Sequence, residues 1–240
     1  MPHAAQSPHA SAGRYRLATA PALACARCSA YTSTTACMKV LVACEFSGAV
    51  REAFRGCGHD AWSCDLLPAE DDSPHHLQCD VFDILEQDWD AMLFFYPCTN
   101  MCVSGARWFQ FKQKQQARDV ENFRRLSECS IPMTAGENPV GVLSTLYRPP
   151  DQIIHPWQFG HGETKTTCLW LKGLPPLRPT QFVEGRVPRV HWASPGPDRW
   201  KERSRTLPGI AEAMAQQWGA LTEPIRTFTQ TNLPLFTSLP

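Results

Sequence analysis

Short apolar runs, each ending at a polar or small residue, recur along the middle of this 240-residue chain. The clearest run is 91–96 (AMLFFY), which is too short for a typical helix, rich in aromatic residues and followed by Pro97. Such runs are typical of strands that are buried on both faces of a parallel sheet. By the same reasoning we predict further strands at 39–44, 60–64, 77–81, 131–136 and 166–171.

Segments with helical periodicity separate these strands. In the last of them Ile210, Met214 and Trp218 share one face, because residues four apart lie above one another on a helix. We predict helices that start at Ala49, cover 83–89, extend from about 110 to 129, and end the fold at 211–221. Strands that alternate with helices predict an α/β fold with a doubly wound, mostly parallel sheet.

The two ends of the chain differ in composition from the rest. Residues 1–37 contain three arginines and no acidic residue, lack apolar periodicity and are rich in Ala, Ser, Thr and Pro. We interpret them as a disordered extension that results from a mis-set start codon, with Met38 as the natural beginning. Residues 222–240 form a loose tail on the same reasoning, which leaves 38–221 as one domain.

Charge and cysteine content exclude several classes of protein. Lys and Arg number 23, as do Asp and Glu, so no net charge draws the molecule to nucleic acid or to a membrane. No apolar run is long enough to span a bilayer. Eleven cysteines at irregular spacing are typical of reduced thiols, and we expect a cytoplasmic monomer, in a bacterium or a phage-infected cell. The C-x-x-C at Cys25 and Cys28 has no second pair, so we expect no metal site.

Reactive residues follow two of the predicted strands. A proline directly after the 91–96 run ends the strand and places Cys98 at the carboxyl edge of the sheet, where open α/β sheets bind ligands. Cys98 is therefore a candidate nucleophile, although a buried structural cysteine would also suit a strand end. Glu137 and Asn138 follow the 131–136 strand in the same way, where the alternative is an Asn-Pro turn.

A second group of residues predicts a nucleotide-like cofactor. Phe46, Ser47 and Gly48 form a small-residue turn between the first strand and a helix, where backbone N–H groups face a ligand. Asp65 ends the next strand about 20 residues later, a position that suits a ribose diol. Asp80 ends the third predicted strand, although either aspartate could instead cap a helix or a turn.

Basic residues gather late in the chain. The proline-rich, irregular segment 175–205 carries seven basic residues against three acidic ones. Such a segment could follow a nucleic-acid backbone, with Arg199, Lys201 and Arg203 contacting phosphates. The helix after Arg107 is also basic and is the alternative DNA surface.

Taken in order, these blocks resemble the C5-cytosine DNA methyltransferases, and the chain is most similar to the compact, phage-type members. The resemblance rests on Pro97-Cys98, on Glu137-Asn138, on MKVLVACEFSG at 38–48 and on GETKTTCLWLKGLP at 162–175. It covers about 38–221 and implies a Rossmann-like methyltransferase fold. It also implies DNA as substrate and S-adenosylmethionine as cofactor.

The resemblance assigns roles to individual residues. It implies that Cys98 adds to C6 of a flipped cytosine, while Glu137 holds and protonates N3. It implies that Lys165 takes the place of an arginine at the substrate, beside Asn138. The cofactor would lie against the residues Phe46, Ser47, Gly48, Asp65, Asp80 and Pro97.

Three other functions remain open from the sequence. An amino-group methyltransferase acting on adenine N6 or cytosine N4 would share the fold, but the segment 96–99 (YPCT) lacks the Pro-Pro-aromatic loop that holds the amine. A catalytically silent DNA- or nucleotide-binding protein of the same fold is a second alternative. A folate-dependent pyrimidine methylase would also use a cysteine, but it does not need a ribose-binding carboxylate at a strand end.

Overall fold

The computed structural model describes residues 36–192, 196, 199–221 and 223–225. The predictions for 1–37 and 222–240 therefore concern residues that lie almost entirely outside the described part. Of the helices in these ranges, none combines the length and the apolar character that crossing a bilayer requires.

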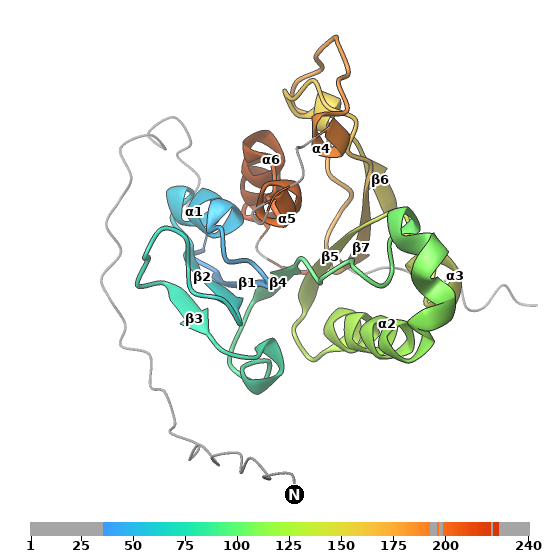
Figure 1. Ribbon diagram of the computed structural model, residues 1–240. Helices are drawn as coiled ribbons and strands as arrows, with labels where there is room; N and C mark the ends of the chain where they lie inside the picture. The colour runs from blue at the N-terminus through green and yellow to red at the C-terminus, as the bar shows by residue number, and fades with distance from the viewer. Residues whose placement is uncertain (1–35, 193–195, 197–198, 222, 226–240) are drawn as a thin grey trace, which may run out of the picture.

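A mixed sheet forms the centre of the fold, and seven strands are described in it (Figure 1). Their order across the sheet is β3-β2-β1-β4-β5-β7-β6. The bounds are Lys39–Ala43 for β1, Asp60–Asp65 for β2, His76–Gln78 for β3, Ala91–Phe94 for β4, Met133–Pro139 for β5, Gln152–Ile154 for β6 and Thr167–Lys172 for β7.

The first five strands run in one direction and β7 runs in the other. β1 pairs in parallel with β2 and β4, β2 with β3, and β4 with β5. β7 is antiparallel to both β5 and β6, with Glu137 opposite Leu169. The prediction of a mostly parallel α/β sheet is thus confirmed for its larger part. The antiparallel edge was not predicted.

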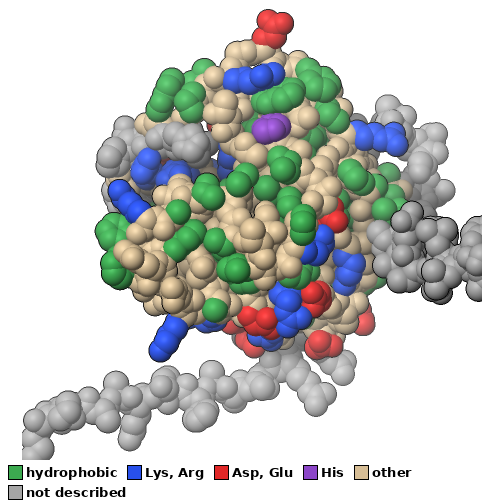
Figure 2. All heavy atoms as spheres, turned by 90° about the vertical axis from the view of Figure 1, so that its right-hand side faces the viewer, with side chains coloured by type: hydrophobic (Ala, Val, Ile, Leu, Met, Phe, Trp, Pro, Cys, Tyr) green, Lys and Arg blue, Asp and Glu red, His purple; other side chains and the backbone are tan. Residues whose placement is uncertain are grey.

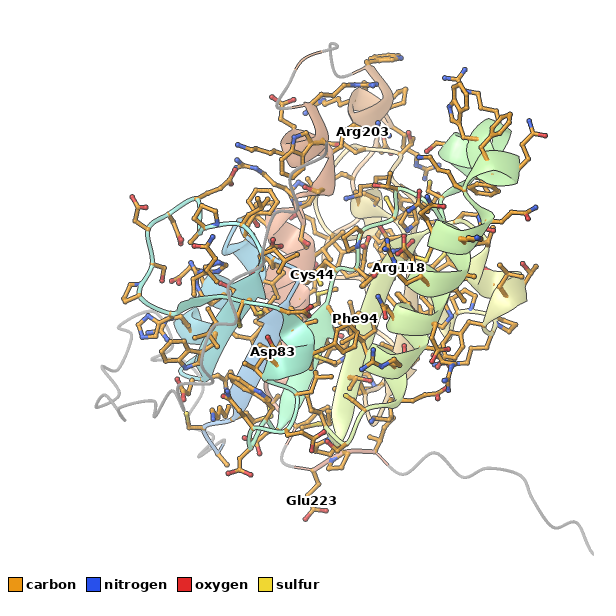
Figure 3. All side chains as sticks on the ribbon, turned by 60° about the horizontal axis from the view of Figure 1, so that its bottom comes forward. Cys44, Asp83, Phe94, Arg118, Arg203 and Glu223 are labelled. Atoms are coloured by element: carbon orange, nitrogen blue, oxygen red, sulfur yellow. The ribbon has the colours of Figure 1, made fainter. Side chains whose placement is uncertain are left out.

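Helices cover both faces of the sheet, and the central strands β1 and β4 are accordingly buried on both sides. On one face, Val40 and Val42 pack with the helices α1 (Ala49–Gly56) and α6 (Pro208–Trp218). On the other face, Leu41 and Phe94 pack with α2 (Gln113–Glu128), where the Phe94 and Phe123 rings lie 5.0 Å apart (Figures 1 and 3). Ile210, Met214 and Trp218 of α6 are buried, as predicted.

Several predicted elements differ in the structure. The helix predicted at 83–89 is wrong, because only the 3-10 turn η1 (Val81–Asp83) forms there. The helix predicted at 110–129 is confirmed as α2, although the 3-10 helix η2 (Val103–Phe111) precedes it and includes its first two predicted residues. Between β5 and β7 lie α3 (Leu143–Leu146), β6 and η3 (Pro156–Gln158). The segment 175–205 contains two short helices, α4 (Arg189–Trp192) and α5 (Arg199–Ser204).

Candidate active site

A cavity of about 720 Å³ opens at the carboxyl ends of β1, β2, β4 and β5. This volume is within the range of small-molecule and cofactor sites. The cavity brings together residues that are far apart in the sequence, because the parallel strands all end at the same edge. Eight residues predicted for the site line it: Phe46, Ser47, Asp65, Pro97, Cys98, Glu137, Lys165 and Arg203.

The loop that carries Cys98 is held in place by buried polar contacts. Asn138 Nδ2 donates a hydrogen bond to the carbonyl oxygen of Tyr96 at 2.8 Å, which links the end of β5 to the end of β4. Asn100 Nδ2 donates to Asp119 Oδ2 of α2 at 2.7 Å, and Gln116 Nε2 donates to the carbonyl of Asn100 at 2.8 Å. These bonds fix the backbone on both sides of the Cys98 thiol.

A second cysteine accompanies Cys98. The backbone N–H groups of Met101 and Cys102 both donate to the carbonyl of Cys98 at 2.9 Å, so the chain makes one tight turn and returns the Cys102 side chain to the cavity. A hydrogen bond between the two sulfurs lowers the pKa of Cys102 to about 5 and raises that of Cys98, which burial and the charges of Cys102 and Glu137 raise further. The proton between the two sulfurs stays on Cys98, so Cys102 is the more acidic thiol of the pair.

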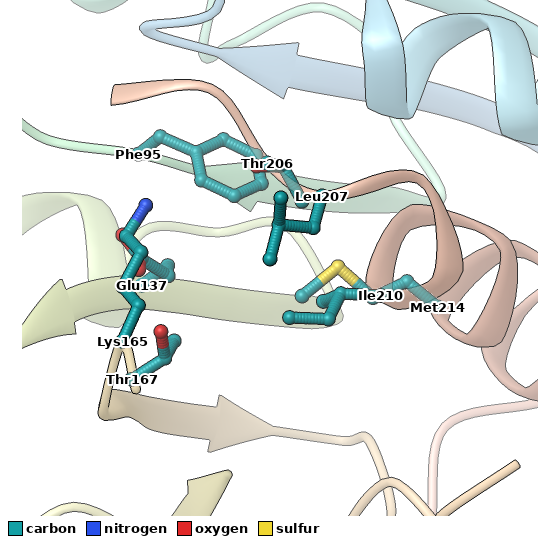
Figure 4. A pocket seen from close by; sticks show the side chains of 8 residues that line it. All are labelled: Phe95, Glu137, Lys165, Thr167, Thr206, Leu207, Ile210 and Met214. Carbon is teal, nitrogen blue, oxygen red and sulfur yellow. The ribbon is translucent and has the colours of Figure 1, made fainter. Parts of the chain in front are cut away.

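Glu137 faces the cavity at the end of β5. Burial raises the pKa of its carboxyl group, while the nearby Lys165 ammonium and a hydrogen bond with Thr167 act in the opposite direction. Figure 4 shows Glu137 and Lys165 side by side at one end of a smaller pocket, with the apolar side chains of Ile210 and Met214 across from them. Apolar surroundings of this kind favour the protonated form of a carboxyl group, which can then act as a proton donor.

The turn after β1 is shaped by Glu45, which is buried. Its carboxylate accepts hydrogen bonds from the N–H groups of Val50 at 2.7 Å and Arg51 at 3.3 Å, at the start of α1. Burial raises the pKa of Glu45 to about 7 despite these bonds. Gly48 begins the helix with φ +72°, and a Cβ there would collide with the Arg51 guanidinium. Gly48 thus shapes the turn without reaching the cavity.

The segment 199–206 forms part of the cavity wall. Trp200 packs against Phe46 with the ring centroids 5.4 Å apart. Lys165 Nζ donates to the carbonyls of Arg203 at 3.1 Å and Arg205 at 3.4 Å, and Arg205 forms an ion pair with Glu70 at 2.7 Å. Figure 3 shows Arg203 above Cys44, which also lines the cavity.

Five residues predicted for the site do not line the cavity: Gly48, Asp80, Asn138, Arg199 and Lys201. Asp80 is exposed and caps η1, with Oδ1 accepting from the N–H of Phe82 at 3.0 Å. Asn138 is buried, and its Nδ2 donates to the carbonyl of Tyr96 without reaching the cavity. Asp65 does reach the cavity, although it also accepts a hydrogen bond from the N–H of Leu67 at 2.9 Å.

Sequence reasoning missed three residues of the cavity wall. Cys102 could have been found from its spacing, because a residue four positions after Cys98 returns to the same side of a helical turn. Glu45 could have been considered as a cap for the helix that begins four residues later. Trp200 gave no local signal, since tertiary packing alone brings it to Phe46.

In the part of the chain that the structure describes, no group of three or more His, Cys, Asp or Glu side chains is arranged so that it could hold a metal ion.

No family model matches the chain, and no curated protein does. Among solved structures, a similar one is an E. coli protein encoded within a prophage and described as a candidate DNA modification methyltransferase. The two share 14% sequence identity with a TM-score of 0.45, over 66% of this chain and 55% of that one. This chain thus spans about half the length of that structure. So distant a likeness has no bearing on function.

Proposed function

We propose that this chain is a DNA (cytosine-5) methyltransferase that uses S-adenosylmethionine. One observation carries the proposal: Cys98 and Glu137, at the ends of the adjacent strands β4 and β5, face the same cavity as the turn 44–47 and Asp65. A nucleophile, a carboxyl group of raised pKa and a nucleotide-type turn are the groups that this reaction requires. The order of the sequence blocks supports the same reaction.

The residues in the cofactor half of the cavity fit an adenosine-containing ligand. Phe46 and Trp200 offer aromatic surface, Ser47 offers a hydroxyl group, and the Asp65 carboxylate can accept hydrogen bonds from ribose hydroxyls. Pro97 supplies a flat apolar wall between this half and Cys98. When bound, the cofactor supplies a methyl group on a positively charged sulfur.

The chain's own residues prepare the base. C5 of cytosine is a poor nucleophile, so Cys98 Sγ first adds to C6 as a thiolate, after its proton passes to Cys102. Glu137 donates a proton to N3, which accommodates the electron pair that moves into the ring. C5 then accepts the methyl group, a base removes the C5 proton, and the C6–Sγ bond breaks to release Cys98.

Phosphate contacts belong to the segment 199–206 in this proposal. Arg203 lines the cavity, and Arg199 and Lys201 lie on the same short helix α5. Each phosphate contact that is lost reduces the slope of log affinity against log salt by about one. The triple variant Arg199→Ala, Lys201→Ala, Arg203→Ala should therefore bind duplex DNA more weakly and with a smaller salt slope. An unchanged slope would exclude this segment.

The test of the reaction is incubation with duplex DNA and methyl-labelled S-adenosylmethionine, followed by base analysis. The proposal predicts label in 5-methylcytosine, and label in N4-methylcytosine or N6-methyladenine would replace it with an amino-group methyltransferase. DNA that contains 5-fluorocytosine should form a denaturation-resistant adduct, because fluorine is not eliminated as the C5 proton is. Cys98→Ala should abolish the adduct, while the control Cys37→Ala, at an exposed cysteine, should retain it.

A further inference from the structure

The helix η2 carries large apolar side chains on the outside of the molecule. Trp108 is 50% exposed, Phe111 is 70% exposed and Val103 is 57% exposed. No side chain of η2 is buried, so these residues do not contribute to the core. Exposed apolar groups that lie together on a surface mark sites of interaction.

The charge around this surface selects the partner. Residues 103–118 contain four basic residues and no acidic one. The Arg107 guanidinium lies 5.2 Å from the centroid of the Trp108 ring, and the Trp108 and Phe111 rings are 6.4 Å apart. On the face that Figure 2 shows, Lys and Arg side chains lie among hydrophobic ones. Aromatic rings among cations suit a polyanion whose bases are free to stack, which is single-stranded nucleic acid.

The surface is continuous with the candidate active site. Val103, Ser104 and Gly105 line the cavity, so η2 starts beside Cys102 and extends outward from the cavity wall. The N–H of Val103 donates to the carbonyl of Val140 at 3.2 Å, which ties the start of η2 to the end of β5. The nucleotides next to a base held in the cavity would therefore reach η2.

We propose that Trp108 and Phe111 form a stacking platform for unpaired bases beside the target cytosine, so that the enzyme binds single-stranded or locally unpaired DNA in preference to duplex. The inference rests on the proposed function and specifies its substrate. Base stacking on an aromatic ring is sequence-tolerant, and truncation of one such ring to alanine weakens binding about five-fold or more.

The experiment measures fluorescence anisotropy of a labelled single-stranded oligonucleotide of about 16 nucleotides, without cofactor. Trp108→Ala and Phe111→Ala should each weaken binding about five-fold or more, and their effects should combine in the double variant. The salt slope should stay unchanged, because the phosphate contacts remain. Trp108→Phe should retain most of the affinity. Phe182→Ala is the matched control, since Phe182 is 67% exposed and packs on Trp157 instead of on η2.

Three outcomes would overturn the platform: no binding of single strands by the wild type, equal binding by the double variant, or a double variant that changes only self-association in sedimentation velocity. The melting temperature of each variant tests that folding is intact. Formation of 5-methylcytosine by a protein whose variants bind like the wild type would leave the proposed function standing without the platform. Ring-dependent binding of single strands with no methyl transfer would overturn the proposed function alone.

Discussion

The shared proton of Cys98 and Cys102 predicts how the pair reacts with an alkylating reagent. With the pKa of Cys102 lowered to about 5, most molecules carry one thiolate in the pair at pH 7. In Cys102→Ala, Cys98 loses the Cys102 thiolate that accepts its hydrogen bond and retains the burial and the Glu137 charge that raise its pKa above the usual 9. About one molecule in 100, or fewer, then carries a thiolate at pH 7.

Rates at neutral pH alone would conceal this difference. A thiolate of low pKa is a weaker nucleophile, and a difference of four pKa units lowers its intrinsic reactivity about 40- to 100-fold. That loss nearly offsets the gain of about 100-fold in thiolate content. The pH at which reactivity is lost is therefore the quantity to measure.

The assay follows iodoacetamide labelling of each cysteine by mass spectrometry across a range of pH. In the wild type, labelling of the pair should be lost only as pH falls through about 5, whereas in Cys102→Ala labelling of Cys98 should already be lost as pH falls through a value above 9. Cys102→Ser, whose hydroxyl can donate to a thiolate on Cys98, should lie between them. Cys129→Ala is the control away from the cavity and should leave the profile of the pair unchanged. A wild-type midpoint near 9 would refute the shared proton.

Three further predictions concern stability. Asp119→Ala should lower the free energy of unfolding by about 1–3 kcal/mol in urea titration, because the side chain of Asn100 loses its hydrogen-bond partner. An unchanged free energy would show that this bond does not stabilise the loop. Gly136→Ala should lower the free energy of unfolding by about 1–3 kcal/mol in the same assay, since the new Cβ would collide with the buried rings of Phe94 and Phe123. An unchanged free energy would mean that the rings can move aside. Burial lowers the pKa of His59, so the unfolded chain binds a proton more readily, and stability should fall as pH falls through 6.5. His59→Asn should lack this part of the pH dependence, so urea titrations should show the stability difference between wild type and variant changing as pH falls through 6.5, and a constant difference would contradict the prediction.

Local signals in the sequence were sufficient for the central strands and for Cys98. The apolar run that ends at Pro97 forms β4, and the strands β1, β2 and β5 also lie close to their predicted positions. A proline ends a strand through its own covalent structure, so no knowledge of the rest of the fold is needed. Both Cys98 and Glu137 therefore lie at the predicted edge of the sheet.

The remaining differences have tertiary causes. The apolar spacing at 84–89 resembled that of a helix, but this segment forms a series of turns that bury Ile84, Leu85 and Trp89. Trp89 Nε1 donates a hydrogen bond to the carbonyl of Ile84 at 2.9 Å. The direction of β7 depends on the strands with which it pairs, so no local sequence pattern predicts it. The prediction that Asn138 belongs to the site could have been avoided from the sequence. Neighbouring side chains of a strand point to opposite faces, so Glu137 and Asn138 could not both face the cavity. That rule was available from the sequence.

The antiparallel strand β7 also limits how this protein can change in evolution. Because β7 runs toward the opposite edge, its start brings Lys165 to Glu137, with Thr167 paired to Pro139. Along β7 the side chains pack alternately on the two faces, Leu169 on one and Trp170 on the other. Loss or gain of one residue in this strand would exchange the faces of the residues beyond it and displace Lys165. Related sequences should therefore vary in β7 by substitution and keep its length constant.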